Sequence, residues 1–261
     1  MVGGCSTGLV ALALRPATVT DDDDVAGPPT DAPAAIVRID HSPPAVSAPT
    51  TSLRAGVALA GTALPIRVAW SGSDGGGSGI DRYEVARSTN GGSSWVTVAP
   101  SLSTMAYNGT VASSGTVRYR VRAVDRAGNV GAWTAGPTVA PRLVQQSRPA
   151  IHYGGAWTAT TSPSFSGGSV RHAGAAGRSA RYTFTGRSIG FVTTKSPTRG
   201  KVKVYVNGHL VTTLDLRAAT KYRVIAWQKT WSTAATRTVR LVVTGTTTHP
   251  RIDLDAFARL K

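Results

Sequence analysis

The stretch from Val117 to Val124 reads VRYRVRAV, in which hydrophobic residues alternate with three arginines. Successive side chains of a β-strand point to opposite faces of a sheet, so this alternation predicts a half-buried strand with its arginines in solvent. The stretch from Leu64 to Trp70, LPIRVAW, alternates in the same way and predicts a second strand of this kind. No segment shows a convincing helical period, and the patterns therefore predict an all-β fold.

The composition extends this prediction to the whole chain. Its 261 residues suffice for two domains of ordinary size, and a hydrophobic content of 41% permits packed cores. The 29 glycines and 15 prolines favour turns, and charged residues make up only 16%, which is low for a helical enzyme. We therefore predict two β-sandwiches, each built from short strands separated by turns.

Residues 1–46 are predicted to form a disordered linker or a truncated signal or lipoprotein region. An acidic run from Asp21 to Asp24 is followed by closely spaced prolines, and such a stretch cannot bury a core. Val2-Gly3-Gly4-Cys5 resembles the end of a lipoprotein signal, although no basic region and no apolar core precede it. Cys5 is the sole cysteine, so no intramolecular disulfide bond can form. A truncated signal and a tail without function both stay open.

Three features stand out in residues 47–142, namely Trp70 on an early strand, SGIDRYEV from Ser78 to Val85, and YRVRAVDRAGN from Tyr119 to Asn129. With these features the segment resembles a fibronectin type III domain. Tyr119 takes the position of the tyrosine that closes a corner of such a sandwich. The resemblance implies an immunoglobulin-like sandwich that acts as a spacer in a bacterial secreted protein and has no activity of its own.

Residues 143–261 show a second series of strands at regular spacing. The predicted strands lie at residues 180–184, 189–193, 201–206, 209–216, 222–231, 236–244 and 252–258. Asn207 and Gly208 predict a two-residue hairpin between two of them, because both residue types tolerate a positive φ. This many short strands in one segment predict a sandwich or jelly roll.

Four stretches of this C-terminal segment are distinctive: GGSV from Gly167 to Val170, ARYTFTG from Ala180 to Gly186, RGKVKVYVNG from Arg199 to Gly208, and IDLDAF from Ile252 to Phe257. Through these stretches the segment resembles the galactose-binding-like jelly rolls, which include many bacterial carbohydrate-binding modules. The resemblance implies non-catalytic binding of a carbohydrate. Many members bind calcium through an early pair of glutamates, and this segment contains no Glu. We therefore expect no cofactor, and the carboxylate count does not support a structural calcium ion, which stays open.

Catalysis by this chain is not expected. Glycoside hydrolysis needs two carboxylates that flank the scissile bond, and the only glutamate is Glu84 in the first domain. Asp253 and Asp255 lie two residues apart on one predicted strand and would therefore share a face. We favour a structural interpretation, in which one of them binds a backbone group or an arginine and locks the final strand. The histidines are widely spaced with no nearby cysteine, so we predict no metal site and no catalytic residue.

The net charge of +16 lies entirely in the C-terminal part. Residues 1–140 hold 10 basic and 10 acidic residues, whereas residues 141–261 hold 19 basic and three acidic residues. Such a field attracts polyanions over about one Debye length, roughly 8–10 Å. We expect a polysaccharide or an anionic cell-wall polymer as partner, and nucleic acid is less favoured because the basic residues are scattered. The alternative is that the charge serves solubility alone.

Four side chains are predicted to bind the ligand: Trp157, His172, Lys195 and Arg199. Sugars stack on aromatic faces and receive hydrogen bonds from polar side chains, and Trp157 lies in an irregular stretch of glycine, threonine and serine. Lys195 and Arg199 belong to the loop at residues 194–200, where the family resemblance places the usual site. His172 follows a Gly-Gly-Ser turn. For each residue, an ordinary place in a solvated loop is the alternative.

These observations predict an extracellular or cell-surface protein that binds carbohydrate or cell-wall polymer through its C-terminal jelly roll and has no enzymatic activity. No apolar run reaches the roughly 18 residues that a transmembrane helix needs, so we predict no membrane-spanning segment. The alternatives are a structural or adhesive surface segment and an accessory tail of a secreted glycoside hydrolase. Nothing in the pattern predicts an oligomeric state.

Overall fold

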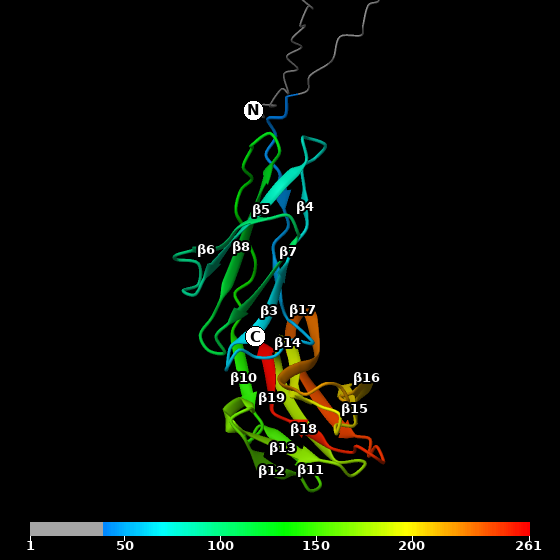
Figure 1. Ribbon diagram of the computed structural model, residues 1–261. Coiled ribbons are helices and arrows are strands. Elements are labelled where there is room, and N and C mark those ends of the chain that lie inside the picture. The colour runs from blue at the N-terminus through cyan, green and yellow to red at the C-terminus, as the bar shows by residue number, and fades with distance from the viewer. Residues whose placement is uncertain (1–38) are drawn as a thin grey trace, which may run out of the picture.

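The computed structural model describes residues 39–261, and nearly all of their regular structure is β-strand. Two β-sandwiches lie end to end along the long axis of the molecule (Figure 1). The prediction of an all-β fold is therefore confirmed. The predicted signal or lipoprotein region around Cys5 lies outside the described residues. No helix among residues 39–261 is long and apolar enough to cross a membrane.

The first sandwich consists of two antiparallel sheets. One has the strand order β2-β3-β7, and the other has the order β6-β5-β8-β9. Strands β1 and β4 form a separate two-stranded ladder. The strand bounds are β1 (Ala45–Val46), β2 (Thr50–Leu53), β3 (Leu64–Ala69), β4 (Gly72–Ser73), β5 (Ile80–Ser88), β6 (Val96–Leu102), β7 (Ala106–Val111), β8 (Arg118–Asp125) and β9 (Thr134–Ala135).

Strand β8 has the apolar inner face that the sequence predicts, but the prediction that its arginines lie in solvent is wrong, because Arg118, Arg120 and Arg122 are all half-buried. Its buried inward side chains include Tyr119, Val121 and Ala123. On the outer face, the guanidinium carbon of Arg120 lies 4.6 Å from the ring centroid of Trp95 and 4.4 Å from that of Trp133. A cation–π contact of this kind contributes about 0.5–1 kcal/mol at an exposed site. Stacked side chains therefore stabilise the outer face of this sheet as well as its core face.

Residues 39–46 fall in the segment that the sequence assigns to the linker, but they pack against the first sandwich. The carboxylate of Asp40 accepts hydrogen bonds from the backbone N–H groups of Ser42 at 2.9 Å and Ser78 at 2.7 Å. Strand β1 then pairs with β4. One aspartate thus fixes a proline-rich segment, and the prediction for these eight residues is wrong because composition does not reveal such a bond.

The second sandwich packs a seven-stranded sheet against a three-stranded sheet. The large sheet has the order β10-β19-β14-β17-β15-β16, with β11 also paired to β14, and the small sheet has the order β12-β13-β18. The bounds are β10 (Pro141–Gln145), β11 (Ile151–Gly154), β12 (Thr158–Thr161), the 3-10 helix η1 (Ser166–Gly168), β13 (Ser169–Ala173), β14 (Ser179–Lys195), β15 (Lys201–Val206), β16 (His209–Asp215), β17 (Lys221–Val243), β18 (Ile252–Leu254) and β19 (Ala256–Leu260).

Strands β14 and β17 are longer than predicted. The sequence predicts a break near residues 185–188 and another near residues 232–235, whereas each strand is continuous in the structure. The predicted breaks coincide with a shift of register, because Gly186 pairs with Ala235 while Ser188 already pairs with Thr230. Residues 231–234 therefore bulge out of the ladder without ending it.

The turn between β15 and β16 confirms the predicted hairpin. Asn207 and Gly208 have φ values of 49° and 85°, so Val206 pairs directly with His209. Positive φ at both turn residues gives a twist that suits the flanking strands.

The end of the chain changes sheets where the sequence predicts one strand. The chain leaves the small sheet after Leu254 and enters the large sheet at Ala256. Asp255 is the single residue between these two strands. The prediction that Asp253 and Asp255 share a face of one strand is therefore wrong, since the crossing between sheets interrupts the alternation.

The two sandwiches share one hydrophobic cluster. Leu53 and Leu59 of the first sandwich are 2% and 4% exposed, and they belong to the same buried cluster as Val192, Ile225 and Leu260 of the second. Figure 1 shows the C-terminus at this junction. Burying a leucine side chain contributes about 1.5–3 kcal/mol, so this contact stabilises the sandwiches as one packed unit.

Backbone hydrogen bonds reinforce the junction. The N–H group of Gly56 donates to the carbonyl of Ile225 at 2.8 Å, and that of Leu59 donates to the carbonyl of Arg223 at 2.9 Å. The N–H group of Ile225 in turn donates to the carbonyl of Val57 at 3.0 Å. Arg223 has a φ of 54°, which is uncommon for a residue with a side chain. The loop from the first sandwich therefore holds β17 in a conformation that β17 would rarely adopt alone.

We expect Leu59→Ala to lower the free energy of unfolding by about 2–5 kcal/mol, because it opens a cavity in the shared cluster. The matched control is Leu210→Ala on β16, where the leucine is 53% exposed and the change should cost less than about 0.5 kcal/mol. Urea denaturation of both variants measures the difference. Equal, small effects in the two variants would contradict a shared core.

Candidate functional site

Arg199 and Asp253 form the most buried ion pair among the described residues. The Nε and Nη2 atoms of Arg199 lie 2.8 Å and 2.7 Å from Oδ2 of Asp253. Its Nη1 atom donates to Oγ1 of Thr198 at 2.7 Å and to Oγ of Ser196 at 3.2 Å. Oδ1 of Asp253 accepts a hydrogen bond from Nε of Arg251 at 2.7 Å. The guanidinium that the sequence assigns to a ligand is thus already bound within the protein.

His172 lies on β13 beside this ion pair. Its Cα is in register with that of Asp253 on β18, and its Nε2 lies 3.0 Å from Oγ1 of Thr160. Partial burial and the charge of Arg251 lower the pKa of His172, and Arg199 adds to this effect while Asp253 opposes it. The imidazole is therefore mostly neutral at pH 7 and already has a hydrogen-bond partner.

Trp157 packs at the edge of the second core. Its ring centroid lies 5.2 Å from that of Tyr153, and the side chain is half-buried. Its indole N–H is buried and has no hydrogen-bond partner among residues 39–261. An unmet buried donor of this kind costs about 1–3 kcal/mol. Thr158, the next residue, is in register with His172.

Lys195 lies apart from the other three predicted residues. It ends β14 and is in register with Lys221 on β17, and Nζ of Lys221 donates to the carbonyl of Gly56 at 3.0 Å. This edge of the sheet faces the junction between the sandwiches. The structure therefore brings His172 and Arg199 together at Asp253, places Trp157 on the neighbouring strand, and leaves Lys195 elsewhere.

Asp255 is buried where the chain crosses between the sheets. Its Oδ2 accepts a hydrogen bond from the N–H group of Ser166 at 3.1 Å, and its Oδ1 has no partner in the described part of the chain. Burial raises the pKa of Asp255 to about 7, against the opposing effects of the Ser166 N–H and the charge of Arg223. Asp253 thus binds arginines and Asp255 binds a backbone group, which is the type of contact that the structural interpretation expects of one of them.

The second sandwich does not fit a calcium ion. Both oxygens of Asp253 are bound by guanidinium groups, whose positive charge repels a cation. Asp255 holds a proton in a large share of molecules near neutral pH. Calcium takes six to eight oxygen ligands, and the single cluster of three acidic or histidine side chains in residues 39–261 lies in the first sandwich.

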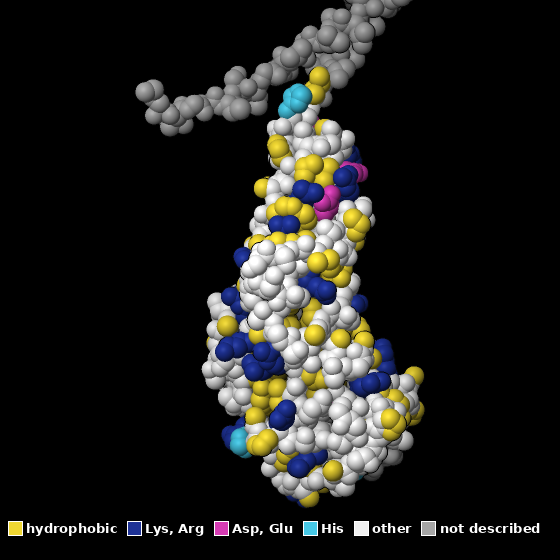
Figure 2. Space-filling model, turned by 90° about the vertical axis from the view of Figure 1, so that its left-hand side faces the viewer, with side chains coloured by type: hydrophobic (Ala, Val, Ile, Leu, Met, Phe, Trp, Pro, Cys, Tyr) yellow, Lys and Arg dark blue, Asp and Glu magenta, His cyan; other side chains and the backbone are white. Residues whose placement is uncertain are grey.

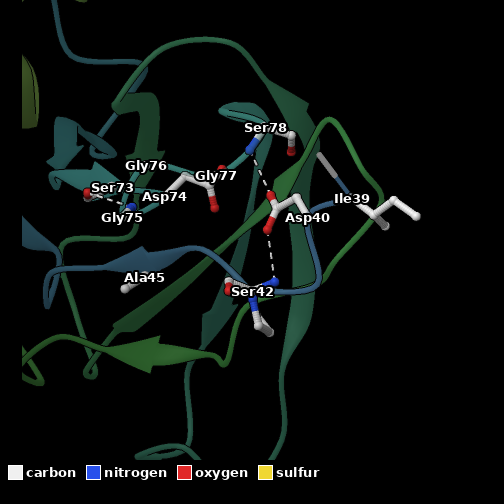
Figure 3. A pocket seen from close by; sticks show the side chains of 11 residues that line it. Ile39, Asp40, Ser42, Ala45, Ser73, Asp74, Gly75, Gly76, Gly77 and Ser78 are labelled. Atoms are coloured by element: carbon white, nitrogen blue, oxygen red, sulfur yellow. Dashed lines mark hydrogen bonds between the residues drawn. The ribbon is translucent and has the colours of Figure 1, made fainter. Parts of the chain in front are cut away.

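A pocket of about 690 Å³ opens at the end of the first sandwich that lies away from the second. Figure 3 shows Asp40 between Ser42 and Ser78, with Asp74 on the facing side. The glycine-rich turn from Gly75 to Gly77 forms one wall. Only glycine fits at position 77, because a Cβ atom there would collide with the carboxylates of Asp40 and Asp74.

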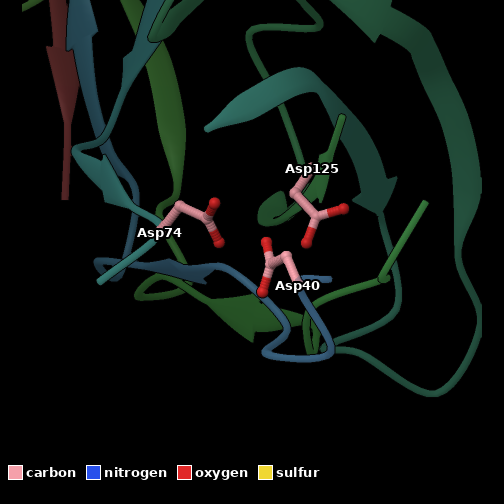
Figure 4. A group of neighbouring side chains, drawn as sticks. All are labelled: Asp40, Asp74 and Asp125. Carbon is pink, nitrogen blue, oxygen red and sulfur yellow. The ribbon is translucent and has the colours of Figure 1, made fainter. Parts of the chain in front are cut away.

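Three carboxylates meet beside this pocket, those of Asp40, Asp74 and Asp125, and they have atoms within 4.8 Å of one another (Figure 4). Five of their six oxygens accept N–H hydrogen bonds from Ser42, Ser78, Gly79 and Asn129. The N–H groups of Ser78 and Ser42 lower the pKa of Asp40. Carboxylates at this spacing have the ligand chemistry for a hard cation, while the bonds already present join three turns of the first sandwich.

Sequence reasoning does not predict this aspartate cluster. Asp40 falls in the segment assigned to the linker, and Asp74 and Asp125 fall in two separate turns. The available signal is that Asp74 and Asp125 each stand at the start of a turn that contains glycine. Aspartates at such positions often accept hydrogen bonds from nearby backbone N–H groups. That signal does not say which turns meet in space.

No protein-family model matches the sequence. A curated relative from Flavonifractor plautii, described as "A type blood alpha-D-galactosamine galactosaminidase", is 30% identical over 109 residues. The match covers 42% of this chain and 10% of the relative. The chain thus spans about a tenth of the length of the curated relative that it matches.

Three solved structures are similar to part of the chain. A family two carbohydrate esterase from Cellvibrio japonicus has 14% identity and a TM-score of 0.38, over 47% of this chain and 34% of that chain. The family 35 carbohydrate binding module from Clostridium thermocellum has 14% identity and a TM-score of 0.31, over 45% and 98%. The CBM36-1 domain of a xylanase from the hindgut metagenome of Trinervitermes trinervoides has 14% identity and a TM-score of 0.33, over 46% and 96%.

We expect Arg199→Gln to lower the free energy of unfolding by about 3–5 kcal/mol, because it leaves the buried Asp253 carboxylate with one cationic partner. Arg217→Gln is the matched control, since this exposed side chain forms no ion pair with a described residue. It should cost less than about 0.5 kcal/mol. Urea denaturation at pH 7 measures the free energy of unfolding of both variants. An unfolding midpoint of Arg199→Gln equal to that of the wild type would refute the structural role of Arg199.

We expect the stability difference between Asp255→Asn and the wild type to change with pH. The pKa of Asp255 is about 7 in the folded protein against an ordinary value of 3.8, so the folded state holds an extra proton between about pH 4 and 7. The contribution of this group to the free energy of unfolding therefore falls by about 4 kcal/mol as pH rises through that window. Above pH 7 the contribution stays constant. The asparagine variant does not have this loss.

Thermal or urea unfolding at pH 4.5, 6 and 8 measures this difference. Asp255→Asn should gain stability relative to the wild type with each step in pH. Parallel pH profiles for Asp255→Asn and the wild type would show that the carboxyl is ionised throughout.

Proposed function

We propose that this chain is a non-catalytic carbohydrate-binding protein of the bacterial cell exterior, which binds a polysaccharide or an anionic cell-wall polymer through its second sandwich. The observation that carries the proposal is the charge of that surface. Residues 141–261 hold 19 basic residues, and Asp215 is the only one of their three acidic residues that is exposed. In the view of Figure 2, magenta side chains lie on the upper sandwich alone, and the lower sandwich shows dark blue.

The positions of the carboxylates support a non-catalytic function. Glu84 lies 2.7 Å from Arg122 in an ion pair on the first sandwich. Asp253 and Asp255 are 0% exposed and hold the final strand in place. Hydrolysis of a glycosidic bond requires two carboxylates that can reach the substrate, and the described part of the second sandwich exposes one.

The proposed domain organisation assigns residues 47–142 to a fibronectin type III-like spacer and residues 143–261 to a galactose-binding-like jelly roll. The sheets of three and four strands in the first sandwich support the first assignment. Strand β10 begins at Pro141 and pairs with β19 of the second sandwich, which supports a boundary two residues before the proposed one. The shared hydrophobic cluster means that the spacer holds the binding domain in a fixed orientation.

Trp157 is the proposed sugar contact of the predicted set, with His172 as its polar neighbour, whereas Lys195 lies too far away to belong to this contact. Its indole N–H lacks a partner in the described residues, and its ring lies at the edge of the core. Arg199 contributes to this site by holding Asp253 and with it β18, next to His172.

A second candidate function is that of an accessory part of a secreted glycoside hydrolase. The specific observation in its favour is the 30% identity to part of a galactosaminidase. On this proposal the chain binds glycans that carry α-linked galactosamine. A glycan array with and without terminal galactosamine tests it, and equal signals on both would exclude that specificity.

We expect the full chain to bind at least one member of a panel of neutral and acidic polysaccharides in affinity electrophoresis, and Trp157→Ala to weaken this binding about tenfold, a loss of about 1.4 kcal/mol. Trp95→Ala, which removes a half-buried tryptophan of the first sandwich, is the control and should keep wild-type affinity. A chain that stays unretarded by every polysaccharide would refute the proposed function and favour a purely structural or adhesive segment.

A further inference from the structure

A row of basic side chains crosses the outer face of the large sheet in the second sandwich. His152 on β11 is in register with Arg181 on β14, and Arg181 is in register with Arg240 on β17. All three side chains are exposed. Adjacent strands are about 4.8 Å apart, so the three groups lie side by side on one surface.

Arg181 and Arg240 lie opposite each other, and no acidic side chain among the described residues neutralises their charges. Neither Arg181 nor Arg240 forms an ion pair with any residue in 39–261. Like charges directly opposite across an antiparallel pair are destabilising. Two of the three acidic residues of this sandwich are fully buried, so they cannot screen the pair from the surface. The protein therefore maintains an unfavourable juxtaposition that an external anion would relieve.

The row borders a small pocket. His152, Arg181 and Arg240 line a space of about 260 Å³ together with Tyr153, Gly154 and Ser179. This volume is below the usual range for drug-sized ligands and suits a single charged sugar residue. The guanidinium carbon of Arg240 lies 5.1 Å from the ring centroid of Tyr205, a contact that limits the freedom of this arginine.

The neighbouring groups favour a sugar over a nucleic acid base. The next row on the same face pairs Thr183 with Thr238, whose hydroxyl oxygens are 2.8 Å apart and suit the hydroxyls of a sugar ring. Single-stranded nucleic acids bound without base-specific contacts are held by a basic groove with free aromatic faces on which bases stack. The ring of Tyr153 is instead occupied by Trp157 at 5.2 Å and by the guanidinium of Arg171 at 4.7 Å.

We infer that His152, Arg181 and Arg240 form a subsite for the oxyanion of an acidic polysaccharide. Each guanidinium presents paired N–H groups that match a carboxylate or a phosphate, and the imidazole adds a third polar contact. This inference rests on the proposed function and places its charged contact on the sheet face, away from the loop at residues 194–200. The polymer then lies along the threonine rows of β14 and β17.

Isothermal titration calorimetry of the full chain at about 0.15 M salt tests the inference. The probes are polygalacturonate, a poly(glycerol phosphate) teichoic acid, neutral galactan and double-stranded DNA. We expect at least one of the two acidic polymers to bind, and the double variant Arg181→Gln/Arg240→Gln to lose at least tenfold in affinity for it. Which of the two binds more tightly identifies the oxyanion as carboxylate or phosphate.

The control double variant is Arg148→Gln/Arg217→Gln, which removes two exposed charges elsewhere on the second sandwich. Its affinity should fall less than threefold. The melting temperature of Arg181→Gln/Arg240→Gln should stay unchanged or rise by about 1–4 °C, because a like-charge pair has been removed. Loss of affinity without loss of stability distinguishes a binding role from a structural one.

Four outcomes would overturn the inference. Equal losses in both double variants would mean that the charge acts diffusely. Binding of DNA that is as tight as that of the acidic polymers and as sensitive to Arg181 and Arg240 would make the row a nucleic-acid contact. Binding of neutral galactan alone, unaffected by either double variant, would leave the proposed function standing and remove this subsite. Binding of no polysaccharide at all would remove both.

Discussion

The carboxylate of Asp253, held between Arg199 and Arg251, is the interaction on which the second sandwich depends. It fixes β18 against the loop at residues 196–200, and the chain then crosses to the large sheet through Asp255. After this crossing, β19 lies between β10 and β14. Ala256, Ala258 and Leu260 of this strand belong to the cluster that joins the two sandwiches. The last ten residues therefore both close the second sandwich and attach it to the first.

The same interaction determines the electrostatics of the surface. Two of the three carboxylates in residues 141–261 are buried inside the protein. Nearly all charged side chains on the exterior of this sandwich are therefore basic. The arginines on the outer face of β14 and β17 consequently meet no negative partner among the described residues. The first sandwich differs, since its outer arginines stack on tryptophans or pair with Glu84. Arg181 and Arg240 on the second sandwich have no carboxylate partner of this kind among the described residues.

Much of the fold follows from the sequence, because strand alternation and turn residues are local signals. The sidedness of β8 and the hairpin at Asn207 and Gly208 needed only the side-chain period and the tolerance for positive φ. The site was less predictable, because it depends on which distant segments meet. Arg199 was singled out as a flexible loop donor, and only the fold shows that it is buried against Asp253. The row of His152, Arg181 and Arg240 could not be found from the sequence, since strand register decides it.

Chemical footprinting of the arginines tests the central claim most directly, namely that an acidic polysaccharide is held on the outer face of the second sandwich. The full chain is treated with an arginine-specific dicarbonyl reagent with and without a saturating acidic polymer, and modification is read by peptide mass spectrometry. The account predicts that the polymer protects Arg181 and Arg240 while the exposed Arg148 and Arg217 stay reactive. Equal protection of all four, or protection confined to the first sandwich, would contradict it.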